Sequence, residues 1–275
     1  MVVINEKEFK QFSEYIRRNY GIYFKEEKKS LVAGRLNNLL TGMDIHNLKE
    51  YMDYVEADKT GRAAADMLDK LTTNYTFFLR EAEHFYYFRD KVLPYLVNTV
   101  RDKDLRVWSA ACSTGEEPYT LAMIMDEFFG REKSVWDTRI LATDIASSVL
   151  ASARTGIYRK EKLEDLPETW RKRYFKSYDA ENSILIDRIR EEVIFANLNL
   201  MDLSFPFKRR MHVIFCRNVM IYFDNNTKDE LIERLYDAME PGGFLFIGHS
   251  EGLNRDKTRF RYVMPAVYRK EQGTW

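Results

Sequence analysis

The sequence predicts an α/β protein with a mostly parallel sheet, a small all-α domain before it and a small β insertion within it. Three observations carry this prediction. From residue 105 onward, short apolar runs alternate with helical stretches, which is typical of a parallel sheet covered by helices. Residues 1–77 show only helical apolar spacing, and residues 167–192 interrupt the alternation.

Composition and charge restrict the class of protein. Hydrophobic residues make up 45% and charged residues 31% of the 275 residues, which excludes a disordered or low-complexity chain. Lys+Arg and Asp+Glu are both 43, so no net charge attracts nucleic acid, and no nucleic-acid partner is expected. There is no signal-like N-terminus or membrane-spanning apolar run, so we expect a cytoplasmic protein without membrane insertion.

Cysteines and histidines give no sign of a metal centre or a disulfide. Cys112 and Cys216 each end an apolar run, and we expect two buried thiols. The histidines are scattered without ligand spacing, so the sequence predicts no metal site. They are His46, His84, His212 and His249.

The first 77 residues read as four helices. Phe9, Phe12 and Ile16 mark the first helix, which Gly21 ends, and the apolar residues within 31–40 mark the second. Asn47 with Glu50 resembles a capping box at the start of a third helix that runs to Val55. Met67, Leu68 and Leu71 mark the fourth. No strand pattern is present in this region.

Residues 78–272 read as the α/β domain, with the insertion at about 167–192. Strands are expected over 105–111, 139–144, 192–198, 211–216 and 243–249, with an antiparallel edge strand within 261–269. Helices are expected over 84–100, 117–129, 146–154 and 227–239.

The loop after the first strand indicates the charge of the ligand. Ligands of open α/β sheets bind beyond the carboxyl ends of the strands. There, Gly115 permits a tight turn, but Glu116 and Glu117 occupy the helix N-terminus where a diphosphate would bind. A positively charged ligand fits better, although both glutamates could simply complement the helix dipole.

Polar residues follow three other strands. Asp144 suits ribose hydroxyls, or it caps the helix beginning near Ala146, and the two roles are compatible. Asn218 and Tyr222 are polar in an apolar stretch, although Tyr222 could also be core. Together these features predict a site for a phosphate-free, positively charged nucleoside, and S-adenosylmethionine fits that description.

Several long motifs identify a family. The strings LTTNYTFFLREAEHF, WSAACSTGEEPYTLAM, LATDI, FCRNVMIYFD and PGGFLFIGHSE closely resemble the chemotaxis receptor methyltransferases, the CheR-type protein-glutamate O-methyltransferases. The resemblance implies an S-adenosylmethionine-dependent enzyme with a Rossmann-like methyltransferase domain and with S-adenosylhomocysteine as product. It also implies glutamate methyl esters on the cytoplasmic helices of chemoreceptors, formed for sensory adaptation.

The resemblance also implies site residues. Those matching cofactor contacts are Asn74, Thr76, Arg80, Glu117, Asp144, Asn199, Leu200, Asn218 and Val219. The nearby pair Asn197 and Leu198 leaves the alignment at Asn199 open. Arg80 and Tyr222 match the residues nearest the transferred methyl group and are the catalytic candidates. A glutamate is ionised at neutral pH, so no general base is required.

The sequence gives fewer indications of how the receptor is bound. Residues 1–40 hold eight Lys or Arg and five Glu, so a basic face at Arg17, Arg18, Lys28 and Arg35 suits an acidic helix. A solvated helix surface is the other interpretation. Residues 177–183 lack the glycine of a tail-binding loop, which favours a tail-independent enzyme, and we expect a monomer.

The sequence gives less support to three other functions. A non-catalytic module that senses S-adenosylmethionine would need no Arg80 or Tyr222. An RNA or small-molecule methyltransferase is disfavoured by the neutral charge and by the lack of an Asn-Pro-Pro-Tyr-type motif at 218–222. A nucleotide-dependent oxidoreductase is disfavoured by the single loop glycine and the two glutamates.

Overall fold

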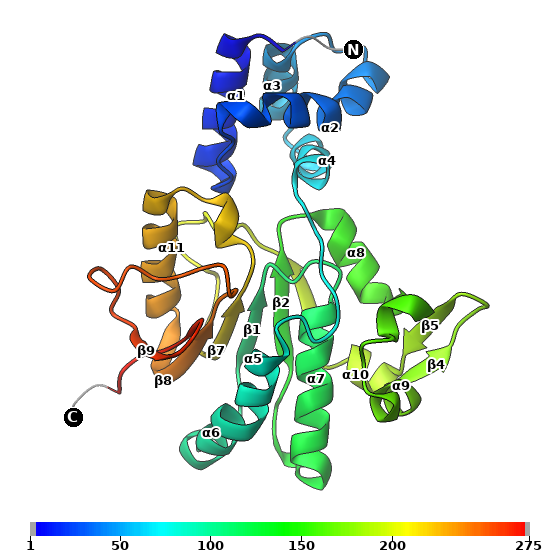
Figure 1. Cartoon of the computed structure of the whole chain (residues 1–275), viewed down its shortest axis with the longest axis vertical. Coiled ribbons are helices and arrows are strands. Elements are labelled where there is room, and N and C mark those ends of the chain that lie inside the picture. Colours follow the sequence, from blue (N-terminus) through cyan, green and yellow to red (C-terminus); the bar gives the residue numbers. More distant parts are fainter. Residues whose placement is uncertain (1–3, 273–275) are drawn as a thin grey trace.

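The computed structural model describes residues 4–272. A helical domain lies beyond the carboxyl ends of the strands of an α/β domain (Figure 1). The helices of the first domain are α1 (Glu6–Tyr20), α2 (Lys29–Gly42), α3 (Leu48–Ala57) and α4 (Arg62–Leu71), with a short 3₁₀ turn η1 (Glu26–Lys28) before α2. Their inward faces form a separate apolar core that includes Phe12, Ile16 and Leu36. The four predicted helices are confirmed.

Local capping explains where these helices begin and end. The Asn5 side chain accepts from the Glu8 N–H, and Glu8 returns the contact to the Asn5 N–H, which completes a capping box. Gly21 ends α1 in the left-handed conformation. Asn47 caps α3 as predicted, while the Glu50 carboxylate accepts from the His46 N–H instead of the Asn47 N–H.

The second domain is built on a seven-stranded sheet in the order β6-β2-β1-β7-β8-β10-β9. The strands are β1 (Val107–Ala110), β2 (Ile140–Asp144), β6 (Val193–Asn197), β7 (Met211–Cys216), β8 (Met239–Phe246), β9 (Arg261–Met264) and β10 (Val267–Arg269). The first five strands in that order are parallel, and β10 pairs antiparallel with β8 and β9. The mostly parallel sheet is therefore confirmed.

The C-terminal edge of the sheet differs in detail from the prediction. The segment 261–269 forms two antiparallel strands, because Ala266 adopts a left-handed conformation and turns the chain back. Strand β8 begins at Met239, so Glu240–Gly243 lies within the strand. The register with β7 shifts there, between Met211 and Val213.

Helices cover both faces of the sheet (Figure 1). One face packs against α5 (Ala82–Tyr87), the π-helical turn η2 (Phe88–Val92), α6 (Leu93–Thr99) and α7 (Glu116–Phe129). The other face packs against α11 (Asn225–Asp237). Strands β1 and β7 are buried along their whole length, as their continuous apolar sequences predict.

A second, three-stranded sheet lies beside α7. It consists of β3 (Ile157–Arg159), β5 (Asn182–Leu185) and β4 (Phe175–Ser177). Strand β3 precedes the range 167–192 in which the sequence predicted small strands. The remaining elements are η3 (Gly130–Val135), α8 (Ser147–Thr155), η4 (Lys160–Leu163), α9 (Glu168–Tyr174), α10 (Asp187–Arg190) and η5 (Met220–Tyr222).

His212 in β7 is a buried acceptor, which makes stability depend on pH. Its Nδ1 accepts from the Arg106 N–H at 3.1 Å, and burial with the nearby Arg106 charge lowers the pKa of His212 to about 4. The unfolded chain takes up this proton near its ordinary pKa of about 6.5. The free energy of unfolding therefore falls as the pH decreases from about 6.5 to 4.

We predict that His212→Asn reduces this pH dependence. An Asn side chain can still accept from the Arg106 N–H but does not titrate, so the slope of the unfolding free energy should drop by about 1.2 kcal/mol per pH unit near pH 5.5. Urea denaturation between pH 4.5 and 7 measures the slope. An unchanged slope would show that His212 titrates alike in both states.

Candidate functional site

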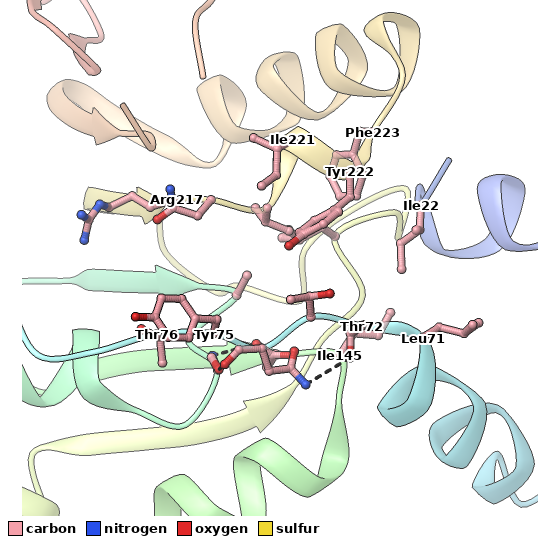
Figure 2. A pocket seen from close by; sticks show the side chains of 18 of the residues that line it. Ile22, Leu71, Thr72, Tyr75, Thr76, Ile145, Arg217, Ile221, Tyr222 and Phe223 are labelled. Atoms are coloured by element: carbon pink, nitrogen blue, oxygen red, sulfur yellow. Dashed lines mark hydrogen bonds between the residues drawn. The ribbon is translucent and has the colours of Figure 1, made fainter. Parts of the chain in front are cut away.

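A cavity of about 750 Å³ lies between the helical domain and the carboxyl ends of the strands (Figure 2). Its walls come from residues 20–35 of the helical domain, from the segment 71–80 and from the loops after β1, β2, β6 and β7. All ten candidate residues line it: Asn74, Thr76, Arg80, Glu117, Asp144, Asn199, Leu200, Asn218, Val219 and Tyr222.

The loop between β1 and α7 has a conformation that requires glycine. Gly115 has φ of 92°, and a Cβ there would lie 3.0 Å from the Tyr158 hydroxyl and from the Ala153 Cβ. The Tyr158 hydroxyl donates to the Thr114 carbonyl at 2.7 Å, so the small sheet supports the loop from outside the cavity. The turn predicted at Gly115 is confirmed.

The two glutamates of this loop point to different places, which corrects the prediction that a ligand meets both. Glu116 is fully buried away from the cavity, where it accepts from Lys162 at 3.0 Å and from the Thr114 hydroxyl at 2.6 Å. Only Glu117 lines the cavity. Successive residues of a helix lie about 100° apart, so neighbours in sequence face different surroundings.

Arg217 is the partner that sequence analysis missed. Its buried guanidinium donates to the Glu117 carboxylate at 2.9 Å and to Glu81 at 3.0 Å, and it also donates to the Arg80 carbonyl. Ser109 donates to the other Glu117 oxygen at 2.7 Å. The available signal was a single cation directly after the buried run MHVIFC.

This network carries one more negative charge than positive charge. Two carboxylates, Glu81 and Glu117, share the one guanidinium of Arg217. Burial raises the pKa of Glu81, but Arg217 and the Asn218 amide outweigh burial and lower the pKa overall. The net negative charge favours a cationic ligand group beside Glu117.

Asp144 serves the backbone and the cavity together. Its carboxylate accepts from the Ser113 N–H at 2.8 Å and from the Ala146 N–H at 3.0 Å, at the start of α8. Burial raises its pKa, partly opposed by these backbone donors. Since Asp144 also lines the cavity, oxygen lone pairs remain for ligand hydroxyl groups, and the capping and binding interpretations are compatible.

The chain turns sharply after β7. Asn218 has φ of 58°, its N–H donates to Glu251 at 3.0 Å, and its side-chain amide donates to Glu81 at 3.0 Å. Five of the eight left-handed non-glycine residues in the described chain lie in or beside the cavity: Leu79, Glu81, Ala111, Ser113 and Asn218. Such conformations cluster at functional sites, where the surrounding structure holds them.

Both residue pairs considered after β6 reach the cavity, the first of them only through Leu198. Leu198, Asn199 and Leu200 line the cavity, whereas the Asn197 amide donates to the Ile145 carbonyl at 2.9 Å. The Asn199 amide donates to the Asn19 carbonyl of α1 at 2.6 Å. Residues 71–80 form the linker between the two domains and one wall of the cavity. There, the Asn74 amide donates to the Thr72 hydroxyl, and the Asn74 carbonyl accepts from the Ser113 hydroxyl.

Arg80 differs from the other charged groups of the cavity. It is half-buried, donates to the Tyr75 carbonyl at 2.9 Å and lies over the Phe77 ring at 6.0 Å. Within residues 4–272, no carboxylate lies at ion-pairing distance from its guanidinium. Arg80 is therefore a cation available to a carboxylate from another molecule.

Tyr222 is held by the helical domain. Its carbonyl accepts from the Tyr23 N–H at 2.8 Å, and Ile22 and Phe223 form an antiparallel bridge beside that bond. Figure 2 shows Tyr222 over the cavity, with Ile22 entering from the neighbouring helical segment. The connection between α1 and α2 is thus part of the site, which no local sequence signal indicated.

The four residues of the predicted basic face have different roles. Arg17 pairs with Glu14 at 2.7 Å and with Asp224 at 3.1 Å. Arg35 donates to the Leu71 carbonyl and the Thr73 hydroxyl, so it holds the linker. Arg18 and Lys28 are exposed, and of these two Lys28 lines the cavity.

One group among the described residues could offer three metal ligands. Ligand atoms of Glu81, His84 and His249 lie within 4.8 Å of one another. However, Glu81 already accepts from Arg217, Asn218 and the His249 N–H. Burial and the Arg217 charge lower the pKa of His84 to about 4. The adjacent guanidinium disfavours a second cation, so we assign these residues to the ion-pair network.

The fold and the cavity suit S-adenosylmethionine. A cavity of this volume is in the range used by small-molecule sites. Glu117 lies beside it with excess negative charge, and Asp144 presents a carboxylate at the end of β2. These features fit a cationic nucleoside without phosphate. They define the class of the protein as an S-adenosylmethionine-dependent methyltransferase with a Rossmann-like fold.

Comparison with known proteins gives the family. A model described as "CheR methyltransferase, SAM binding domain" matches residues 74–268, and one described as "CheR methyltransferase, all-alpha domain" matches residues 7–72. The chain therefore belongs to the CheR methyltransferase family, as its motifs predicted. It is an enzyme that transfers methyl groups in chemotaxis with S-adenosylmethionine as cofactor.

Curated relatives match over nearly their whole length. The chain is 37% identical to "Chemotaxis protein methyltransferase" of Borreliella burgdorferi, covering 97% of this chain and 95% of that protein. It is 35% identical to the protein of the same name from Escherichia coli, covering 97% and 92%. None of the helices in residues 4–272 has the length and apolar character that crossing a bilayer requires.

We predict that Gly21→Ala damages the contact between the domains. Gly21 has φ of +75°, and a Cβ there would lie 2.6 Å from the Met201 sulfur and 3.1 Å from the Phe223 ring. The unfolding free energy should fall by at least about 1 kcal/mol, and methylation should slow because the adjacent segment holds Tyr222.

Gly34→Ala is the matched control. Gly34 lies inside α2 with nothing within 4 Å of the added Cβ, so alanine should stabilise the protein by about 0.5–1 kcal/mol. Urea denaturation measures both changes. Equal effects of the two variants would contradict the role of Gly21.

Proposed function

We propose that this enzyme methylates glutamate side chains on the cytoplasmic helices of chemoreceptors, forming methyl esters for sensory adaptation. One observation carries the substrate chemistry. The cavity's own carboxylates have partners, since Glu117 pairs with Arg217 and Asp144 accepts backbone N–H groups. Arg80 lines the same cavity, and no carboxylate among the described residues forms an ion pair with it. A carboxylate from another molecule can fill that place.

In this proposal Glu117 would hold the ammonium group of S-adenosylmethionine and Asp144 its ribose hydroxyls. Asn199 and Leu200 would lie at its adenine, and Asn74, Thr76, Asn218 and Val219 would supply further contacts. When bound, S-adenosylmethionine supplies a positively charged methyl group that the glutamate carboxylate takes up as an ester.

The residues of the chain mainly orient the substrate. A glutamate has a reference pKa of about 4.3 and needs no base at neutral pH. Arg80 binds the incoming carboxylate, and Tyr222, which lines the same cavity, keeps it aligned. Because Arg80 is only half-buried, its ion pair is partly hydrated, which avoids an overly stable ground state. Orientation in a confined cavity supplies much of the rate.

Other functions receive less support. A module that only senses S-adenosylmethionine does not need a free arginine beside the cofactor site, and the curated relatives are called methyltransferases. The absence of net charge disfavours RNA as substrate. The cytoplasmic location, the monomeric state, the domain limits 1–77 and 78–272 and the independence from a receptor tail remain predictions.

Mass spectrometry of receptor fragments tests the proposal. Purified enzyme is incubated with chemoreceptor cytoplasmic fragments and isotope-labelled S-adenosylmethionine. We expect labelled methyl esters on glutamates, with S-adenosylhomocysteine formed in equal amount. Binding of the cofactor without labelled ester on any fragment would favour the sensing module instead.

We predict that Arg80→Ala reduces the methylation rate at least about tenfold, equivalent to about 1.4 kcal/mol, because the substrate carboxylate loses its partner. Arg89→Ala is the control, since Arg89 pairs with Asp90 on an exposed surface. Initial rates are measured with radiolabelled cofactor, and circular dichroism monitors the fold. Near-normal turnover of the Arg80 variant would refute its role.

We predict that Lys28→Glu weakens receptor binding. Lys28 is exposed at the cavity, so reversing its charge should raise the KM for an acidic receptor fragment several-fold at low salt, and less at high salt because of screening. Arg62→Glu, which makes the same change on an exposed residue outside the cavity lining, should leave the KM unchanged. Equal KM values for the two variants would argue for a merely solvated surface.

A further inference from the structure

We propose that four exposed apolar side chains at the cavity form a docking rim for an acidic amphipathic helix. The rim consists of Tyr23, Leu31, Tyr75 and Ile221, and it contacts apolar residues one helical turn from the glutamate being methylated. This inference rests on the proposed function and adds a rule for which glutamates are accepted.

The exposure of these residues is the first argument. Tyr75 is 74% exposed, Ile221 49%, Tyr23 47% and Leu31 41%, and all four line the cavity. They are a third of the twelve large apolar side chains that are exposed in the described part of the chain. Apolar side chains gathered around one opening, with charged groups beside them, mark an interaction site.

The rim is assembled from separate segments. Tyr23 lies in the connection between α1 and α2, Leu31 in α2, Tyr75 in the linker and Ile221 in η5. Figure 2 shows Ile221 on the wall that carries Tyr222, and Tyr75 on the facing linker wall with Thr76. A ligand entering between these walls therefore meets apolar groups on both sides.

Charge determines the kind of partner. Lys25 and Lys28 are exposed and line the same cavity, and no ion pair involves either one within residues 4–272. Arg80 is half-buried and lines the same cavity. One cavity therefore offers a cation for the target carboxylate, exposed apolar side chains and exposed lysines that suit further acidic groups.

A helical substrate segment matches this arrangement of side chains. On a helix, residues three and four positions apart are neighbours, with Cβ atoms about 5–6 Å apart. A glutamate that reaches Arg80 therefore has its one-turn neighbours at the rim. Apolar neighbours bury the exposed side chains of the rim, whereas charged neighbours would lose hydration against Tyr75 or Ile221. In an extended peptide the corresponding neighbours are two positions apart.

The test compares Tyr75→Ser and Leu31→Ser with wild type on one receptor cytoplasmic fragment. Each variant should raise the KM for the fragment about tenfold, with kcat within twofold and an unchanged dissociation constant for S-adenosylmethionine measured by calorimetry. Tyr75→Phe keeps the ring and should recover most of the affinity. Tyr178→Ser, at a 58% exposed tyrosine of the small sheet region, is the control.

Substrate variants provide the second arm. In the same fragment, apolar residues three or four positions from the methylated glutamate are replaced by lysine, which should raise the KM about tenfold. The same replacement two positions away should have little effect. A larger effect at two positions would overturn the helical mode, and unchanged KM values in Tyr75→Ser and Leu31→Ser would overturn the rim. If wild type methylates no fragment, the proposed function itself fails.

Discussion

The buried guanidinium of Arg217 is the interaction on which the site depends. It contacts Glu117 at the start of α7, Glu81 and the Arg80 carbonyl in the linker, and it follows directly after β7. Three walls of the cavity therefore meet at one side chain. Without that cation, two partly buried carboxylates would remain unpaired, which is destabilising, so the ion pair holds Glu117 in position.

The helical domain is a structural part of the site. It supplies the residues 20–35 that line the cavity, and its Tyr23 N–H binds the carbonyl of Tyr222. The ion pair of Arg17 with Asp224 and the bond from Asn199 to Asn19 lie at the same contact between the domains. Residues of the helical domain that look like a receptor-facing surface in sequence thus also hold the two domains together.

The candidate site residues were predictable because each follows a strand or lies in a long motif. All ten line one cavity, since parallel strands bring their carboxyl ends to one edge. The electrostatic argument was incomplete. Glu116 turns away to Lys162, and Arg217 neutralises part of the charge on Glu117. Partners that lie 46 and 100 positions away leave no local pattern in a sequence.

The sequence alone determined the parallel sheet, most of its helices and strands, and a glutamate at the helix terminus of the site, because apolar periodicity and helix-terminal charge are local properties. Only the tertiary structure decided which of two adjacent glutamates faces the ligand, which arginines remain unpaired and which exposed apolar side chains share one opening. Those outcomes depend on side-chain direction and on contacts between distant segments, which packing of the whole chain fixes.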